Sequence, residues 1–291
     1  MRIVILTHSE DRHYFFCNQI IEKTGDVVGV FTGAKSVNKS RFEDIKKTIE
    51  KRETITYVKN KFLNLVFKKD GDRFKVEKKQ AEIKFFSGAT QHFYENHKNL
   101  CVGTVSAKHR SINVQHYVSL IADLKPDIIV VMGTCLIGKA IISSAKHVVN
   151  IHTGLSPYYR GGRTNLWPFI ENEYGRFGVT IHLMSQGIDS GNIIFTDRPS
   201  VFEDDDYATI NCKCILLGTD LMVQAIKLIE KGEMKSIEQW TKGKLFLNRD
   251  WNSQIANKYF QIRGVFLKEY CRLNENNALP KAKLIKNGLE V

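Results

Sequence analysis

The apolar run Asp127-Ile-Ile-Val-Val-Met132 constrains the fold more than any other feature of this 291-residue chain. The residues before it, 111–124, carry apolar side chains at helical spacing, and Pro126 separates the two segments. A helix that leads into a continuously apolar strand is typical of a parallel sheet covered on both faces. The pattern predicts an α/β fold.

Short β-branched runs predict four more strands, at residues 2–6, 26–32, 148–152 and 178–184. The first two are separated by a stretch of helical length, and strand, helix, strand is how a parallel α/β sheet begins. We therefore expect a Rossmann-like, mostly parallel sheet.

The segments outside these strands divide the chain. Residues 35–110 are polar, lysine-rich and weakly periodic, with β-like pieces at 54–58 and 63–67, so we interpret them as a basic elaboration on the sheet rather than part of its core. Two domains are predicted: a catalytic domain at 1–205, and a C-terminal helix with a small α/β extension at 206–291.

The C-terminal part opens with a helix from Thr209 to Lys231 that Gly232 ends and that should pack on the sheet. The acidic cluster 203–206 is best explained as its N-terminal cap. A short strand at 245–247, an amphipathic helix at 252–267 and a frayed basic tail follow. The homodimer hypothesis depends only on that amphipathic helix.

The net charge of +12 comes mainly from residues 35–98 and 231–291. Basic residues alternate there with acidic ones and form no aromatic stacking motif, so a solvated surface is the first explanation and a small phosphate-bearing ligand the second. Nucleic acid is not an expected partner.

The cysteines and the apolar segments indicate the compartment. Six cysteines without a CxxC pair indicate free thiols, and Cys212 and Cys214 lie on different faces of the helix. No apolar stretch reaches the roughly 18 to 20 residues that cross a bilayer, and the N-terminus has no basic leader. We expect a cytoplasmic protein without a membrane span.

The candidate site begins at Asn150-Ile-His152, where alternation places both polar side chains on one face at the carboxyl edge of the sheet. Ligands bind at that edge in open α/β sheets. The loop that follows, Thr153–Arg163, contains Pro157 and two glycines that define a tight path, and it carries the charged Arg160.

Together with Gly178-Val-Thr-Ile-His182 and Gly187-Ile-Asp-Ser-Gly191, this stretch resembles the folate-dependent formyltransferase family. The resemblance is strong over residues 125–200 and loose over 1–32. Where many members have Leu-Leu-Pro, this chain has Leu155-Ser-Pro157, which loosens assignment to a subfamily. The resemblance implies the formyltransferase fold.

The resemblance also implies that 10-formyltetrahydrofolate is the donor, that a primary amine is the acceptor, and that Asn150, His152 and Asp189 are catalytic, with no metal. An amide donor suits an oxyanion, an imidazole suits proton transfer near neutral pH, and a carboxylate orients and charges that imidazole. The expected folate contacts are Gly133, Cys135, Leu136, Met184, Gly187 and Ile188. The expected acceptor contacts are His8, Tyr158, Tyr159 and Arg160.

The remaining histidines receive lesser roles. His182 alternates with Thr180 on its strand and is expected to be structural or to support the catalytic residues. Six others show no ligand spacing and are expected at the surface, so no zinc site is predicted: His13, His92, His97, His109, His116 and His147.

Within the family, the acceptor implied first is a nucleotide-linked amino sugar, used for surface polysaccharide precursors, because those enzymes are similar in size and vary in such appendages. Methionyl-tRNA is the alternative, since Lys35–Lys47 falls where those enzymes have a basic loop. Glycinamide ribonucleotide enzymes are more compact. A formyltetrahydrofolate hydrolase and a non-catalytic binding module also stay open.

Overall fold

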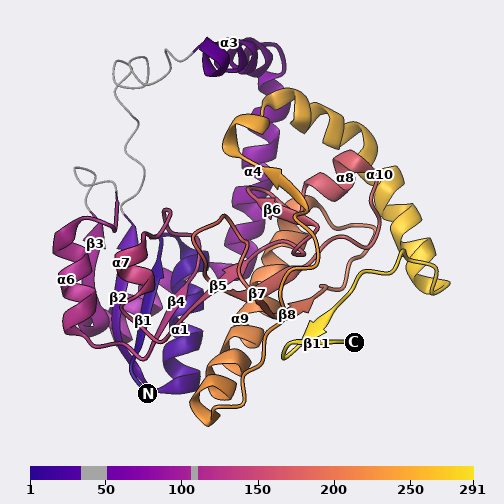
Figure 1. Cartoon of the computed structure of the whole chain (residues 1–291). Helices are drawn as coiled ribbons and strands as arrows, with labels where there is room; N and C mark the ends of the chain where they lie inside the picture. The colour runs from indigo at the N-terminus through magenta and orange to yellow at the C-terminus, as the bar shows by residue number, and fades with distance from the viewer. Residues whose placement is uncertain (34–50, 106–110) are drawn as a thin grey trace.

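A computed structural model of the chain describes residues 1–33, 51–105 and 111–291, with the side chains of 51–54 excepted (Figure 1). A nine-stranded sheet has the order β11-β10-β8-β7-β5-β4-β1-β2-β3. Five consecutive strands are parallel: β3 (Cys101–Val105), β2 (Val27–Gly33), β1 (Ile3–Thr7), β4 (Ile128–Val131) and β5 (His147–His152). The next four run antiparallel to their neighbours: β7 (Val179–Leu183), β8 (Ile193–Asp197), β10 (Ile285–Lys286) and β11 (Leu289–Glu290). The predicted α/β fold with a mostly parallel sheet is confirmed.

The order of the strands reverses around β1, which pairs with β2 on one side and β4 on the other. In open α/β sheets, such a reversal leaves a crevice at the carboxyl ends of the strands where ligands bind. The segments that follow β1, β4 and β5 all begin at this edge.

Helices cover both faces of the sheet, because the side chains of its strands alternate. Ile3 and Ile5 join the larger core, whereas Val4 and Leu6 join a smaller one. The larger core is built with α1 (Asp11–Thr24), α4 (Lys68–Phe86), α5 (Ala89–Asn96), α8 (Trp167–Glu171), α9 (Tyr207–Lys231) and α10 (Ser253–Glu275). The smaller core is built with α6 (Gln115–Asp123) and α7 (Lys139–Ile142), which Figure 1 shows beside β2 and β3.

Helix α9 ends at Lys231 as its sequence predicts and begins at Tyr207, two residues before the predicted Thr209. The Asp206 carboxylate accepts the backbone N–H of Thr209 at 2.7 Å, and Gly232 terminates the helix with φ of 72°. A capping carboxylate satisfies a free N–H and complements the helix dipole. The predicted packing of this helix on the sheet is also confirmed, since it contacts β5, β7 and β8.

The β-like pieces predicted at 54–58 and 63–67 are wrong, because 54–58 and 63–66 lie in helix α3 (Lys51–Val66) and Phe67 is in the turn that follows it. Ile55, Phe62 and Leu65 are mostly exposed on this helix. β-Propensity reflects packing against neighbouring strands. No strand in the described ranges pairs with this segment, so its backbone hydrogen bonds close locally.

The description of residues 35–110 as peripheral is corrected in part. Strand β3 extends the central sheet, and Phe74, Phe86 and Phe93 are buried in the main core. The sequence pattern did not predict this burial, because the three aromatic rings are spread over two helices, α4 and α5, and so form no clear periodicity. Lys35–Lys47 and His109 lie outside the described residues.

The C-terminal tail is not frayed, which corrects another prediction. Strands β10 and β11 form a hairpin on the edge of the main sheet, with β10 beside β8. The predicted strand near 245–247 exists as β9 (Lys244–Phe246), but it pairs in parallel with β6 (Tyr159–Gly161) in a separate two-stranded sheet. Helix α10 packs against α3, α4 and α8 of its own chain, which accounts for the amphipathic pattern that suggested a dimer.

Candidate active site

Strand β5 places Asn150 and His152 at the carboxyl edge of the sheet, as expected. Its register with β7 puts Asn150 opposite His182 and His152 opposite Thr180. His152 is 6% exposed. Both predicted polar residues therefore lie where the strand order leaves a crevice.

Asp189 is held against His152 by the loop after β7. Its Oδ2 lies 3.3 Å from Nδ1 of His152 and accepts the backbone N–H of Gly161 at 2.9 Å. The loop reaches this position with Asp189 in the left-handed region, at φ of 45°, where a non-glycine residue is uncommon. Gln239 donates to the carbonyl oxygen of Asp189 at 2.8 Å and anchors the loop from behind.

The tautomer of His152 follows from its partners. Its Nε2 lies 3.1 Å from the carbonyl oxygen of Tyr159, which can only accept, so Nε2 carries a hydrogen in the neutral ring. Nδ1 is then the atom that takes up a further proton, and it faces the Asp189 carboxylate. A proton held there is stabilised by a negative charge.

His182 links the other two site residues. Its Nδ1 donates to the carbonyl oxygen of Leu183 at 2.8 Å, which leaves Nε2 to accept the side-chain amide of Asn150 at 3.0 Å. The same Nε2 lies 3.6 Å from Oδ1 of Asp189. The supporting role expected for His182 matches this position.

Burial sets the protonation of the pair. It lowers the pKa of His152, although the Asp189 carboxylate opposes that effect. Burial also acts to raise the pKa of Asp189, but His152, His182 and the N–H of Gly161 outweigh it and hold that pKa well below its usual range. An ionised carboxylate thus lies beside an imidazole that is neutral near pH 7, an arrangement suited to moving a proton.

These side chains face a cavity of about 730 Å³. It is lined by the three predicted catalytic residues, by His8, and by all six predicted folate contacts: Gly133, Cys135, Leu136, Met184, Gly187 and Ile188. Leu136 is 75% exposed at this wall. The site therefore combines a cluster of polar, titratable side chains with an apolar, accessible side.

Gly133 shapes this wall by its conformation. It has φ of 62°, and a Cβ at this position would lie 2.7 Å from Cε1 of His13. His13 is buried, which corrects its expected surface location, and its Nδ1 lies 2.8 Å from the Thr7 hydroxyl. Helix α1 carries this ring inward because it packs directly on the sheet.

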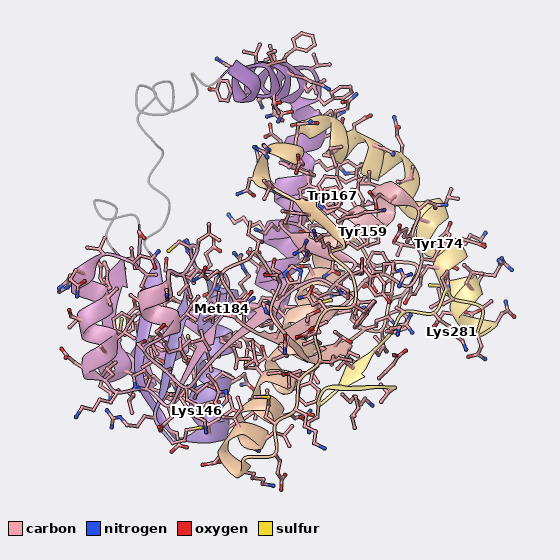
Figure 2. The ribbon with its side chains drawn as sticks, viewed as in Figure 1. Lys146, Tyr159, Trp167, Tyr174, Met184 and Lys281 are labelled. Atoms are coloured by element: carbon pink, nitrogen blue, oxygen red, sulfur yellow. The ribbon has the colours of Figure 1, made fainter. Side chains whose placement is uncertain are left out.

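The three neighbouring residues predicted to bind the acceptor lie elsewhere. Tyr159 is fully buried, stacks with Phe246 and donates a hydrogen bond to Glu171 at 2.6 Å. Trp167 also stacks on Phe246, and Figure 2 shows Tyr159 and Trp167 on the same side of the molecule. Tyr158 contacts Arg176. Neither tyrosine, nor Arg160, lines the cavity.

Arg160 has a local role instead. Its Nη1 donates to the carbonyl oxygen of Ile188 at 3.4 Å, so it joins the loop after β5 to the loop that carries Asp189. Its positive charge also contributes to lowering the pKa of His152.

Several cavity residues were missed by the sequence analysis. Tyr207, Asn211 and Ile215 line the cavity from α9, and their spacing of four residues is the signal that could have placed them on one helix face. Arg163 lines it too, at the end of the loop already singled out.

The structure also assembles a cluster that the histidine spacing did not predict. Glu22, His92 and His97 place potential metal-ligating atoms within 4.8 Å of one another, on α1 and at α5, outside the cavity.

The six cysteines are free, as predicted. In the ranges that the structure describes, no helix is long and apolar enough to cross a bilayer.

Comparison with known proteins places this site in context. The family model described as Formyl transferase matches residues 1–226. A curated methionyl-tRNA formyltransferase of Streptococcus suis is 30% identical over 134 residues, which cover 43% of this chain and 43% of that protein. The chain thus spans less than half the length of this relative.

Solved structures share the fold at lower identity. A 4-N formyltransferase from Francisella tularensis is 16% identical with a TM-score of 0.55, covering 100% of this chain and 95% of that one. An N-formyltransferase from Helicobacter canadensis, in complex with folinic acid and dTDP-3-aminofucose, is 16% identical with a TM-score of 0.52, covering 93% and 81%.

Proposed function

Because this chain belongs to the formyl transferase family, we propose that it transfers a formyl group from 10-formyltetrahydrofolate to the primary amine of a nucleotide-linked amino sugar, a precursor of surface polysaccharide. The observation that carries the proposal is the contact of His152 with Asp189 beside Asn150, on the wall of an accessible cavity.

The proposed folate site is the wall formed by Gly133, Cys135, Leu136 and the loop Met184–Ile188. An exposed leucine and backbone groups at strand ends suit a flat ring system, which needs apolar contact and a few hydrogen bonds. When bound there, the co-substrate supplies an activated formyl carbon.

Asn150 stabilises the oxygen of that formyl group as the amine attacks. One of its two amide hydrogens is directed to Nε2 of His182, which fixes the orientation of the amide and leaves the second hydrogen for the developing oxyanion. Preorganisation of this kind avoids reorienting the donor during the reaction.

His152 accepts the proton that the attacking amine loses and delivers it to the folate nitrogen as the carbon–nitrogen bond to that nitrogen breaks. The new bond joins the amine nitrogen to the formyl carbon, so the atoms balance without a further reactant. Asp189 stabilises the imidazolium at Nδ1 while the proton is held.

The amino sugar is favoured as acceptor by two observations. Folds like this one include an N-formyltransferase in complex with dTDP-3-aminofucose. The chain also carries a net charge of +12, and positive charge suits a nucleoside diphosphate. Methionyl-tRNA is the second candidate, because of the 30% identity to the Streptococcus suis enzyme.

The test is mass spectrometry of the purified protein incubated with 10-formyltetrahydrofolate and a panel of acceptors. The panel contains nucleotide-linked 3-amino and 4-amino sugars, methionyl-tRNA and glycinamide ribonucleotide. A gain of one formyl mass on an amino sugar is expected. A gain only on tRNA, or release of formate with no acceptor modified, would overturn the assignment in favour of the tRNA enzyme or the hydrolase.

A further inference from the structure

A second cavity of about 730 Å³ adjoins the first. It lies between α3, α4 and the segment around Trp251 that leads into α10. The two cavities share Lys78, Arg163, Tyr207 and Asn248 in their walls. They are therefore neighbouring compartments, separated by side chains rather than by a layer of secondary structure.

The second cavity is strongly basic. Its lining contains five cationic side chains and one carboxylate: Lys61, Lys68, Lys75, Lys78, Arg163 and Asp72. The Asp72 carboxylate pairs with two of these lysines, since it accepts hydrogen bonds from Lys68 at 2.5 Å and from Lys75 at 3.0 Å. On the side that borders the catalytic site, Lys78 lies 3.5 Å from Glu82, whose carboxylate Arg12 also contacts at 2.6 Å, so two cations share one carboxylate there.

Arg163 is a cation of this lining without a carboxylate partner among the described residues. Its guanidinium lies over the Trp251 ring, 4.8 Å from the ring centroid, and burial and Tyr207 are the influences on its charge among the described residues. Burial lowers its pKa. A partly desolvated cation without a counter-ion is costly unless a ligand supplies one.

The backbone at Arg163 supports the same conclusion. The residue has φ of 53°, in the left-handed region that costs energy for a side chain of this size. Such strain persists where the surroundings require a particular orientation, and here it keeps the guanidinium in the wall shared by both cavities.

The chemistry of the cavity matches a nucleoside diphosphate. Arg and Lys donate to phosphate oxygens, and a planar guanidinium does so in bidentate fashion. Leu65, Phe74 and Trp251 add apolar and aromatic surface for a base. The volume lies in the range of about 300 to 1,000 Å³ typical of small-molecule sites, and a site of this size suits one nucleotide better than a nucleic-acid chain.

We propose that the second cavity binds the nucleoside diphosphate of the acceptor, with Arg163 and Lys78 on the phosphates, so that the attached sugar extends past the shared wall to Asn150 and His152. This inference rests on the proposed function, because it assigns the part of the acceptor that does not react. Binding energy from such a remote part positions the reacting amine.

The test measures binding of UDP and dTDP to the full chain by isothermal titration calorimetry, without folate. We expect binding in the wild type and a loss of roughly 10- to 100-fold in affinity for Arg163→Met, as for a charge-assisted contact to phosphate. Lys61→Met changes only the second cavity and should weaken binding by a smaller factor. Lys84→Met, an exposed change on α4 outside both cavities, should leave the affinity unchanged.

The outcomes separate this inference from the proposed function. Nucleotide binding that depends on Arg163, with no formyl transfer to any amino sugar, would support the subsite and overturn the reaction. If the protein formylates an amino sugar, and the KM for that sugar in Arg163→Met and in Lys61→Met equals the wild-type KM, the subsite alone would be overturned. It would also be overturned if a tRNA fragment, but neither nucleotide, bound in an Arg163-dependent way.

Discussion

Nδ1 of His152 lies 3.3 Å from Oδ2 of Asp189, although His152 ends strand β5 and Asp189 lies in the loop after β7. The same carboxylate oxygen accepts the N–H of Gly161. The site thus depends on β5, β6 and the loop after β7 holding their relative positions, with Asp189 fixed from both sides.

Loss of the charge at Asp189 should impair proton transfer without unfolding the protein. We expect Asp189→Asn and His152→Ala to reduce kcat for formyl transfer by at least about 100-fold, the usual contribution of a positioned acid-base group. Asp220→Asn, at an exposed ion pair with Lys23, is the matched control. Retention of more than about a tenth of the wild-type rate in either site variant would contradict the assigned roles.

Asn150 should matter more than the histidine that orients it. Asn150→Ala removes the donor to the oxyanion and should lower kcat by about 100- to 1,000-fold. His182→Gln retains an acceptor for the Asn150 amide and should cause a smaller loss. Steady-state kinetics with the acceptor identified by mass spectrometry would compare them, and equal losses in the two variants would argue against the division of roles.

The pH dependence of kcat/KM should report the buried imidazole. The neutral form of His152 accepts the proton, and burial lowers its pKa, so activity should fall only as the pH drops below the ordinary histidine value of about 6.5. Asp189 opposes that lowering, so the residual activity of Asp189→Asn should decline at a still lower pH. His116→Gln, at an exposed position, should leave the profile unchanged. An acidic limb at or above pH 7 in the wild type would rule out this assignment.

Two glycines should respond in opposite ways to alanine. Gly133→Ala combines a positive φ with a contact of 2.7 Å to His13 and should destabilise the protein by about 1 to 3 kcal/mol. Gly264→Ala lies within α10, where a Cβ meets nothing within 4 Å, and should stabilise it by up to about 1 kcal/mol. Urea unfolding of both variants tests the pair, and a neutral Gly133→Ala would show that the loop adapts freely.

The sequence alone determined five strands of the nine-stranded sheet, namely β1, β2, β4, β5 and β7, and the identity of the chemical groups. Continuous apolar runs such as Ile128–Val131 have few alternatives to buried parallel strands, and alternation along β5 places Asn150 and His152 on one face. The ends of α9 were also determined by nearby residues, since Asp206 caps its N-terminus with its side chain and Gly232 ends it with a left-handed backbone conformation. Such features depend on neighbours in the chain, so a pattern in the sequence specifies them.

Only the tertiary structure decided which groups meet. Residues 54–58 have β-branched character but lie in a helix, because no strand is there to pair with them in the described chain. Tyr159 turned into the core rather than the cavity, and Arg163 came to border two cavities. These outcomes depend on packing between segments distant in sequence, such as α4 with α10 and β6 with β9, and contacts of that kind leave no local periodicity to read.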